Sequence, residues 1–177
     1  MADLFFDLET QNSIADVGGR ANLHLLRVSV AVTLSADTGE FRSYTESAVP
    51  ALIADLRAAT RVIGFNIKRF DYEVLKFYTR EHLNDLPTVD MLEDIYNTLG
   101  FRVSLDALAG ATLGAEKTAD GLQAIRWFRE GRIAELSEYC KADVALTRQL
   151  FEFGRTRGYL EFFDRGGRKK QVNVEWK

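Results

Sequence analysis

The stretch Leu4-Phe5-Phe6-Asp7-Leu8-Glu9-Thr10 decides the fold of this chain. Apart from Asp7, its first five residues are apolar and rich in aromatic rings, and a polar stretch follows them, which predicts a short buried strand. Alternate side chains of a strand share a face, so Asp7 and Glu9 point the same way and could share a cation. About one Asp-x-Glu is expected by chance at this composition. A solvated strand end is therefore an equal alternative for this pair.

Two further strands are predicted directly after this one. Gly18-Gly19 marks a loop, and residues 25–34 then have the β-branched, partly alternating pattern of a long strand. Asp37-Thr38-Gly39 turns the chain into a third strand over residues 40–45. Hairpin connections join neighbouring antiparallel strands, so we expect the first three strands to be antiparallel.

The rest of the chain alternates helices and strands. The expected elements are a helix from Ser47 through Leu56, a strand over 61–65, a helix from Ile67 to Tyr78 with Asn66 as its N-cap, a strand over 88–91, a helix from Ser104 to Gly114, a helical segment over 122–127, a long helix over 133–151, and a closing hairpin of 159–163 and 171–176. This order predicts an α/β fold, with a mixed sheet of about five strands flanked by helices and a C-terminal hairpin or tail. No repeat or linker divides it, so residues 1–177 are expected to form one domain.

The composition argues against several classes of protein. The chain has 177 residues, of which 46% are hydrophobic and 28% charged, which is enough for a real core and excludes a disordered chain. Its apolar runs are too short to span a bilayer and no basic-then-apolar leader opens it, so we expect no membrane partner. Cys140 is the single cysteine, which fits a reducing cytoplasm and disfavours a zinc site. The net charge of −3 lacks the basic excess of a protein that binds nucleic acid by charge alone.

Further carboxylates occur at suggestive places on the predicted helices. Asp71 lies in the first turns of a helix that follows a buried strand, although the helix dipole alone explains an aspartate there. Tyr139 and Asp143 are four residues apart on the long helix, which makes their side chains neighbours. A tyrosine that packs its ring and leaves its hydroxyl in water is an equal alternative for Tyr139.

Together these residues form three motifs in a characteristic order: Phe6-Asp7-Leu8-Glu9-Thr10, Asn66-Ile67-Lys68-Arg69-Phe70-Asp71, and Tyr139 to Asp143. The sequence resembles the DEDD superfamily of 3′–5′ exonucleases on the RNase H-like fold. It looks like the tyrosine-bearing branch, close to the proofreading domains of family B DNA polymerases. The resemblance covers roughly residues 2–153, and the basic hairpin of residues 155–177 lies outside it.

The resemblance implies a metal-dependent exonuclease that releases nucleoside 5′-monophosphates. Four crowded carboxylates repel one another unless cations offset them, and oxygen ligands favour magnesium or manganese. By the resemblance, two divalent cations, Mg²⁺ or Mn²⁺, are held by Asp7, Glu9, Asp71 and Asp143. The Tyr139 hydroxyl completes the catalytic set by orienting the attacking water. The substrate contacts implied are Leu8, Thr10, Asn66 and Lys68.

The expected partner is nucleic acid with a single-stranded or frayed 3′ end, DNA being somewhat favoured over RNA. Lys68, Arg69 and Lys117 are candidates for phosphate contacts, although a solvated surface cation explains each of them as well. The sequence is also similar to RNase H-like modules that accompany superfamily-2 helicases, which suggests a helicase as a partner. A role in DNA repair is also expected. Two alternatives stay open: a catalytically silent binding module, and an endonuclease on the same fold. The sequence leaves the oligomeric state open.

Overall fold

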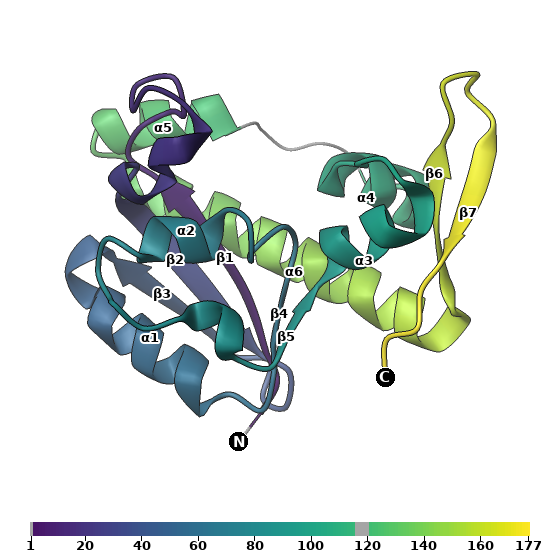
Figure 1. Cartoon of the computed structure of the whole chain (residues 1–177), viewed down its shortest axis with the longest axis horizontal. Coiled ribbons are helices and arrows are strands. Elements are labelled where there is room, and N and C mark those ends of the chain that lie inside the picture. Colours follow the sequence, from purple (N-terminus) through teal and green to yellow (C-terminus); the bar gives the residue numbers. More distant parts are fainter. Residues whose placement is uncertain (1, 116–120) are drawn as a thin grey trace.

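A mixed five-stranded sheet forms the centre of the computed structural model, which describes residues 2–115 and 121–177 (Figure 1). In spatial order the strands are β3 (Phe41–Thr45), β2 (Val28–Ser35), β1 (Leu4–Thr10), β4 (Val62–Gly64) and β5 (Thr88–Asp90). The first three are antiparallel, and β1, β4 and β5 are parallel. This arrangement confirms the predicted mixed sheet and its antiparallel start.

Helices cover the sheet and a strand pair closes the chain. The helices are α1 (Val49–Ala58), α2 (Asp71–Leu75), α3 (Met91–Leu99), α4 (Leu105–Leu113), α5 (Gly121–Arg129) and α6 (Ile133–Arg157), with short 3-10 helices η1 (Arg20–Leu25), η2 (Glu46–Ala48) and η3 (Leu83–Asp85). A separate antiparallel pair follows, of β6 (Tyr159–Phe163) and β7 (Lys169–Asn173). Among the described residues, no helix has both the length and the apolar character that crossing a bilayer requires.

Alternation along β1 assigns its side chains to two cores. Phe5 packs edge-on against Phe151 of α6, with ring centroids 5.6 Å apart. Phe6 points to the opposite face and stacks on Tyr72 of α2 at 6.5 Å, and Leu8 belongs to the same core. Because Asp7 and Glu9 continue the Phe5 series, their side chains lie on the face of the sheet that α6 covers.

The predicted strand over 25–34 begins later than expected. Residues 20–25 form η1, and the strand starts at Val28. Arg27 adopts a left-handed backbone conformation, with φ of 61°, which separates the two elements. Its guanidinium forms an ion pair with Glu46 and lies 4.2 Å from the Phe77 ring centroid. Both contacts are with residues distant in the chain, so the local pattern of β-branched residues did not reveal where the strand begins.

The predicted helix over 67–78 was wrong in its start, its cap and its length. The helix α2 spans only Asp71–Leu75, and its N-cap is Phe70 rather than Asn66. Asn66 has a positive φ of 68°, and the backbone N–H groups of Asn66 and Lys68 donate to the carboxylate of Asp90 at 2.8 and 2.9 Å. These bonds fix residues 66–68 as a turn, because the N–H groups are bound to a strand end rather than to a helix.

The helix α3 was not predicted. Asp90 caps it, because its side chain accepts bonds from the N–H groups of Leu92 and Glu93. The sequence Asp90-Met91-Leu92-Glu93 has a cap residue followed three positions later by Glu, a spacing that marks a helix start. This signal was present in the sequence and would have found the helix.

The remaining predicted helices and the closing hairpin are confirmed. The side chain of Ser104 accepts a bond from the N–H of Ala107 at the start of α4, and Gly114 ends that helix with φ of 69°. The hairpin has its second strand at Lys169–Asn173, two residues earlier than expected. Trp176, which the predicted strand included, lies beyond β7 and is buried against the core.

Candidate metal and catalytic site

Three carboxylates from two elements converge at one end of β1. Asp7 and Glu9 come from the strand, and Asp143 comes from α6, which packs across it. One carboxylate oxygen from each residue lies within 4.8 Å of the others, and all three side chains are partly buried. Such a set of oxygen atoms matches the donors that hard divalent cations prefer.

Two neighbours on α6 complete this cluster. The phenol of Tyr139 lies close to the Asp143 carboxylate, and its ring packs edge-on against Trp127 of α5 with centroids 5.9 Å apart. The buried thiol of Cys140 donates to the backbone oxygen and the carboxylate of Asp7, at 3.6 and 3.7 Å. The sequence placed Cys140 in the core stripe of the helix and gave no sign of its contact with Asp7.

Asp71 lies beside the cluster and is bound to the same strand. Its carboxylate accepts the backbone N–H of Leu8 at 3.0 Å, and the side chain is 2% exposed. The pairing of β1 with β4 covers only Leu4 and Phe5, since β4 ends at Gly64. A Cβ atom on Gly64 would lie 2.8 Å from the Phe6 carbonyl oxygen. Glycine therefore lets β4 approach β1 closely. Beyond the end of β4, the Asp71 carboxylate accepts the hydrogen bond of the Leu8 N–H.

Burial and mutual repulsion of the carboxylates in this cluster favour the binding of protons or metal cations. Burial, and then the charge of Asp143, raise the pKa of Asp7 well above its ordinary value. Burial and then Asp7 raise the pKa of Glu9 and of Asp71 in the same way. A divalent cation would offset this repulsion, because it supplies the opposing charge without a proton. The donor set and its charge therefore fit a site for a hard divalent cation.

The structure separates the four residues predicted to contact substrate. The Leu8 side chain is 3% exposed and belongs to the core beneath α1 and α2, so only its backbone reaches the site. Thr10 is buried too, and its hydroxyl donates to the backbone oxygen of Asn12 at 2.8 Å. Asn66 and Lys68 lie on the turn that follows β4, where the Asp90 carboxylate binds their backbone N–H groups.

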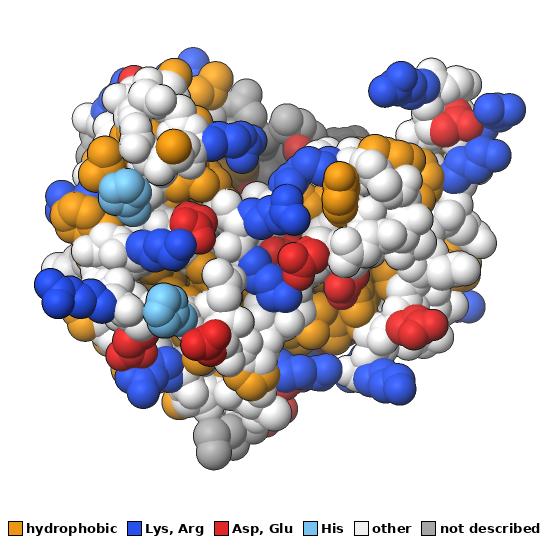
Figure 2. Space-filling view, in the orientation of Figure 1, with side chains coloured by type: hydrophobic (Ala, Val, Ile, Leu, Met, Phe, Trp, Pro, Cys, Tyr) orange, Lys and Arg blue, Asp and Glu red, His pale blue; other side chains and the backbone are white. Residues whose placement is uncertain are grey.

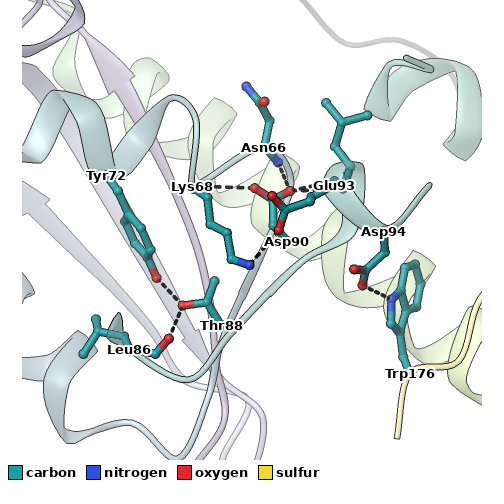
Figure 3. Close-up of polar contacts among 10 residues, drawn as sticks. Asn66, Lys68, Tyr72, Leu86, Thr88, Asp90, Glu93, Asp94 and Trp176 are labelled. Carbon is teal, nitrogen blue, oxygen red and sulfur yellow. Dashed lines mark hydrogen bonds and ion pairs between the residues drawn. The ribbon is translucent and has the colours of Figure 1, made fainter. Parts of the chain in front are cut away.

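The turn with Asn66 and Lys68 is organised by Asp90 (Figure 3). The ammonium group of Lys68 is bound to Glu93 at 2.7 Å, so Lys68 has an ion partner. The Asn66 side-chain oxygen accepts a bond from Arg102 at 2.6 Å. Sequence reasoning kept Asp90 out of the site, yet the 2%-exposed carboxylate binds the backbone of both predicted contact residues.

Four basic side chains meet in an open depression next to this turn. Arg20 and Arg102, which the sequence did not single out, line it together with Lys68 and Arg69 and with the acidic Glu73 and Glu93, and its volume is about 870 Å³. Figure 2 shows Lys and Arg side chains gathered at the middle of this face, between α2 and the α3–α4 pair. The other predicted phosphate contact, Lys117, lies outside the described residues.

Comparison with known proteins defines the class of fold. The profile of the RNase_H superfamily matches residues 4–153, and the chain belongs to this superfamily. No curated protein matches the chain. Solved structures similar to it include the family B DNA polymerase of the hyperthermophilic archaeon Pyrobaculum calidifontis, with a TM-score of 0.65 and 16% identity. The match covers 87% of this chain and 24% of the polymerase chain, so the present chain spans about a quarter of that protein.

Proposed function

We propose that this chain is a metal-dependent 3′–5′ exonuclease that hydrolyses nucleic acid to nucleoside 5′-monophosphates. The observation that carries the proposal is the convergence of Asp7, Glu9 and Asp143 on one point of an RNase H-like domain. The assignment to a 3′ end is supported by the resemblance of the three sequence motifs to those of the tyrosine-bearing exonucleases. The polymerase likeness supports the fold on which this chemistry is proposed.

The proposed ligands of two divalent cations are Asp7, Glu9, Asp71 and Asp143. All four offer oxygen, and burial raises the pKa of the neighbouring Cys140 thiol, which keeps sulfur protonated and out of the ligand set. This selects Mg²⁺ or Mn²⁺ over softer metals. When bound, the cations supply positive charge at the attacking and leaving oxygens of an in-line phosphoryl displacement.

Tyr139 is proposed to position the attacking water as a neutral phenol. Burial and the nearby charges of Asp143, Glu9 and Asp7 raise the pKa of Tyr139 far above its ordinary value, so the hydroxyl keeps its proton. A protonated phenol can donate and accept hydrogen bonds but is no general base. Its position close to Asp143 puts the hydroxyl beside the carboxylates, where it can hold the water in line.

The substrate proposed is a single-stranded or frayed 3′ end, DNA before RNA. The basic side chains beside the Asn66 turn offer contacts for its phosphates. A helicase partner, a role in DNA repair and a cytoplasmic location stay predictions from the sequence.

Digestion of a 5′-labelled single-stranded oligonucleotide, with magnesium, manganese or EDTA, tests the proposal. The wild type is compared with Asp143→Asn, and with Glu138→Gln as the matched control, because Glu138 is a highly exposed carboxylate on the same helix. We expect a metal-dependent ladder that shortens from the 3′ end, is unchanged in Glu138→Gln, and is lost in Asp143→Asn. Discrete internal cuts would instead indicate an endonuclease, and metal binding without cleavage of DNA or RNA would indicate a silent binding module.

A further inference from the structure

The β6–β7 hairpin is a positive element outside the superfamily match, which ends at residue 153. The hairpin, residues 159–173, contains four Lys and Arg residues against two acidic ones, whereas the whole chain has a net charge of −3. The hairpin projects beyond the rest of the fold, and Lys and Arg side chains cluster at its tip (Figures 1 and 2). Positive charge is thus concentrated on one extension of an otherwise acidic protein.

The base of this hairpin is fixed to the domain. The indole N–H of Trp176 donates to Asp94 of α3 at 2.9 Å (Figure 3), and the indole stacks on Phe151 of α6 at 5.4 Å. Thr112 of α4 bonds the backbone of Glu161 in both directions, at 2.9 and 3.1 Å. A ligand on the hairpin would therefore meet a surface already held in place.

A groove separates the hairpin from the start of α4. This hairpin groove is lined by Phe101, Arg102, Phe163, Arg165 and Arg168, among others, and has a volume of about 670 Å³. Phe101 and Phe163 are 49% and 56% exposed, which is unusual for large aromatic side chains. The buried Phe162 supports Phe101 from below, with ring centroids 5.8 Å apart.

The charge of the hairpin groove is positive. Its acidic residue, Asp164, accepts bonds from the N–H groups of Gly166 and Arg168 and pairs with the Arg168 side chain, so its charge is used within the turn. Among the described residues, Arg165 forms no ion pair, and Arg102 donates to the neutral amide of Asn66. Arg102 and Arg165 are therefore available to an anionic ligand.

Arg102 connects the hairpin groove to the candidate site. It lines this groove and also the depression formed with Arg20, Lys68 and Arg69. That depression borders the Asn66 turn, which leads along the chain to Asp71. Arg102 therefore places the hairpin groove next to the basic side chains beside the Asn66 turn.

We propose that the hairpin groove binds the single-stranded part of the nucleic acid whose 3′ end occupies the carboxylate site, an assignment that rests on the proposed function. Bases stack on the exposed rings of Phe101 and Phe163, and phosphates contact Arg102 and Arg165. Aromatic rings alternating with cations select a polymer that carries both bases and charge. An acidic peptide offers charge alone, so it is the weaker fit.

Binding in EDTA tests this groove without cleavage. The probe is a fluorescein-labelled oligothymidylate of about 12 nucleotides, within the range of known single-strand sites, and anisotropy is read at fixed low salt. The double variant Phe163→Ala/Arg165→Ala is compared with Phe41→Ala/Arg80→Ala, which removes an exposed ring and an exposed cation elsewhere. We expect at least about fivefold weaker binding for the groove variant, and a change below about twofold for the control.

Two further probes identify what the groove recognises. With an abasic strand of equal charge, Phe163→Ala alone should have no effect, whereas Arg165→Ala should still weaken binding. Equal loss of affinity in the groove variant and in the control overturns the proposal. So does a polyglutamate peptide that binds the groove as tightly as the oligonucleotide, since that result would assign an acidic protein as the ligand.

Failure of the groove and failure of the proposed function are distinguishable. If the groove proposal fails but the exonuclease proposal holds, metal-dependent digestion persists and the groove variant binds the oligonucleotide as tightly as the wild type. If the exonuclease is wrong but the groove is right, binding depends on Phe163 and Arg165 while no ladder forms. When both hold, KM falls with strand length in the wild type, stops falling in the groove variant, and kcat is unchanged.

Discussion

The carboxylate of Asp71 accepts the backbone N–H of Leu8, 3.0 Å away and between two catalytic candidates on the central strand. A residue 63 positions later in the chain is thus tied to the strand that carries Asp7 and Glu9. The bond gives Asp71 two tasks. It satisfies a buried donor of the strand, and it places a fourth carboxylate beside the cluster.

Substitutions at Asp71 should separate these tasks. Asp71→Asn keeps an oxygen for the Leu8 N–H but removes the charge, so we expect loss of cleavage with little loss of stability. Asp71→Ala leaves the buried N–H without its acceptor and should lower the free energy of unfolding by about 1–3 kcal/mol. Urea unfolding of both variants in EDTA measures the difference. Equal stability of the two would show that the hydrogen bond contributes nothing to folding.

The metal-free protein should lose stability as the pH rises. Burial and neighbouring charge raise the pKa of Asp7 and Glu9 well above their ordinary values of 3.8 and 4.5. Between those values and the raised ones, the native state binds more protons than the unfolded state, so the free energy of unfolding falls with increasing pH. Asp7→Asn should flatten this dependence and raise Tm in EDTA at neutral pH, while it abolishes cleavage.

Adding Mg²⁺ to the wild type should reverse that trend, since ligands must lose protons to bind metal. The gain in Tm on adding Mg²⁺ should grow with pH and be much smaller in Asp7→Asn. Thermal unfolding from mildly acidic to mildly alkaline pH, with and without Mg²⁺, provides the measurement. A metal effect that is independent of pH would contradict the site.

Tyr139→Phe should slow the reaction without disturbing the fold. The ring keeps its packing on Trp127, and only the hydroxyl close to Asp143 is lost. We expect kcat to fall about 10- to 100-fold, the range for losing one hydrogen bond to a charged group, with KM little changed. Tyr159→Phe, on β6, is the matched control and should leave kcat unaffected. A purely structural role for Tyr139 would instead lower Tm and leave the kcat of the folded protein intact.

Asp90→Ala should destabilise the Asn66 turn together with α3. The substitution removes the acceptor for four backbone N–H groups, those of Asn66, Lys68, Leu92 and Glu93. We expect the free energy of unfolding to fall by about 2 kcal/mol or more, since a helix cap and further buried bonds are lost. Hydrogen exchange should quicken at these amides first. Unchanged exchange at Lys68 would contradict a shared anchor.

The parts of the site that lie on long regular elements could be predicted from local patterns in the sequence. A period of two placed Asp7 and Glu9 on one face of β1, and a spacing of four placed Tyr139 beside Asp143 on α6. The mixed sheet followed from the order of the elements. These features depend on residues close together in the sequence, which a pattern can report.

The turn before Asp71 could not be predicted in the same way. Apolar spacing indicated a helix from Ile67, but Asp90 binds the N–H groups of Asn66 and Lys68 from 22 to 24 residues away. Long-range bonds of this kind override local periodicity, and the Arg27 boundary has a similar origin. The contact of the Cys140 thiol with Asp7, across 133 residues, is likewise tertiary.

The central position of β1 affects how the site comes apart. Asp7 and Glu9 lie on a strand paired on both sides near its start, and Asp143 lies on the long helix packed over it, so these three separate only when the whole domain unfolds. Asp71 follows a short turn in which the Asp90 carboxylate binds the N–H groups of Asn66 and Lys68. Local opening of that turn would withdraw one proposed ligand and leave the other three in place, which would reversibly reduce the affinity for the proposed metal without unfolding the domain.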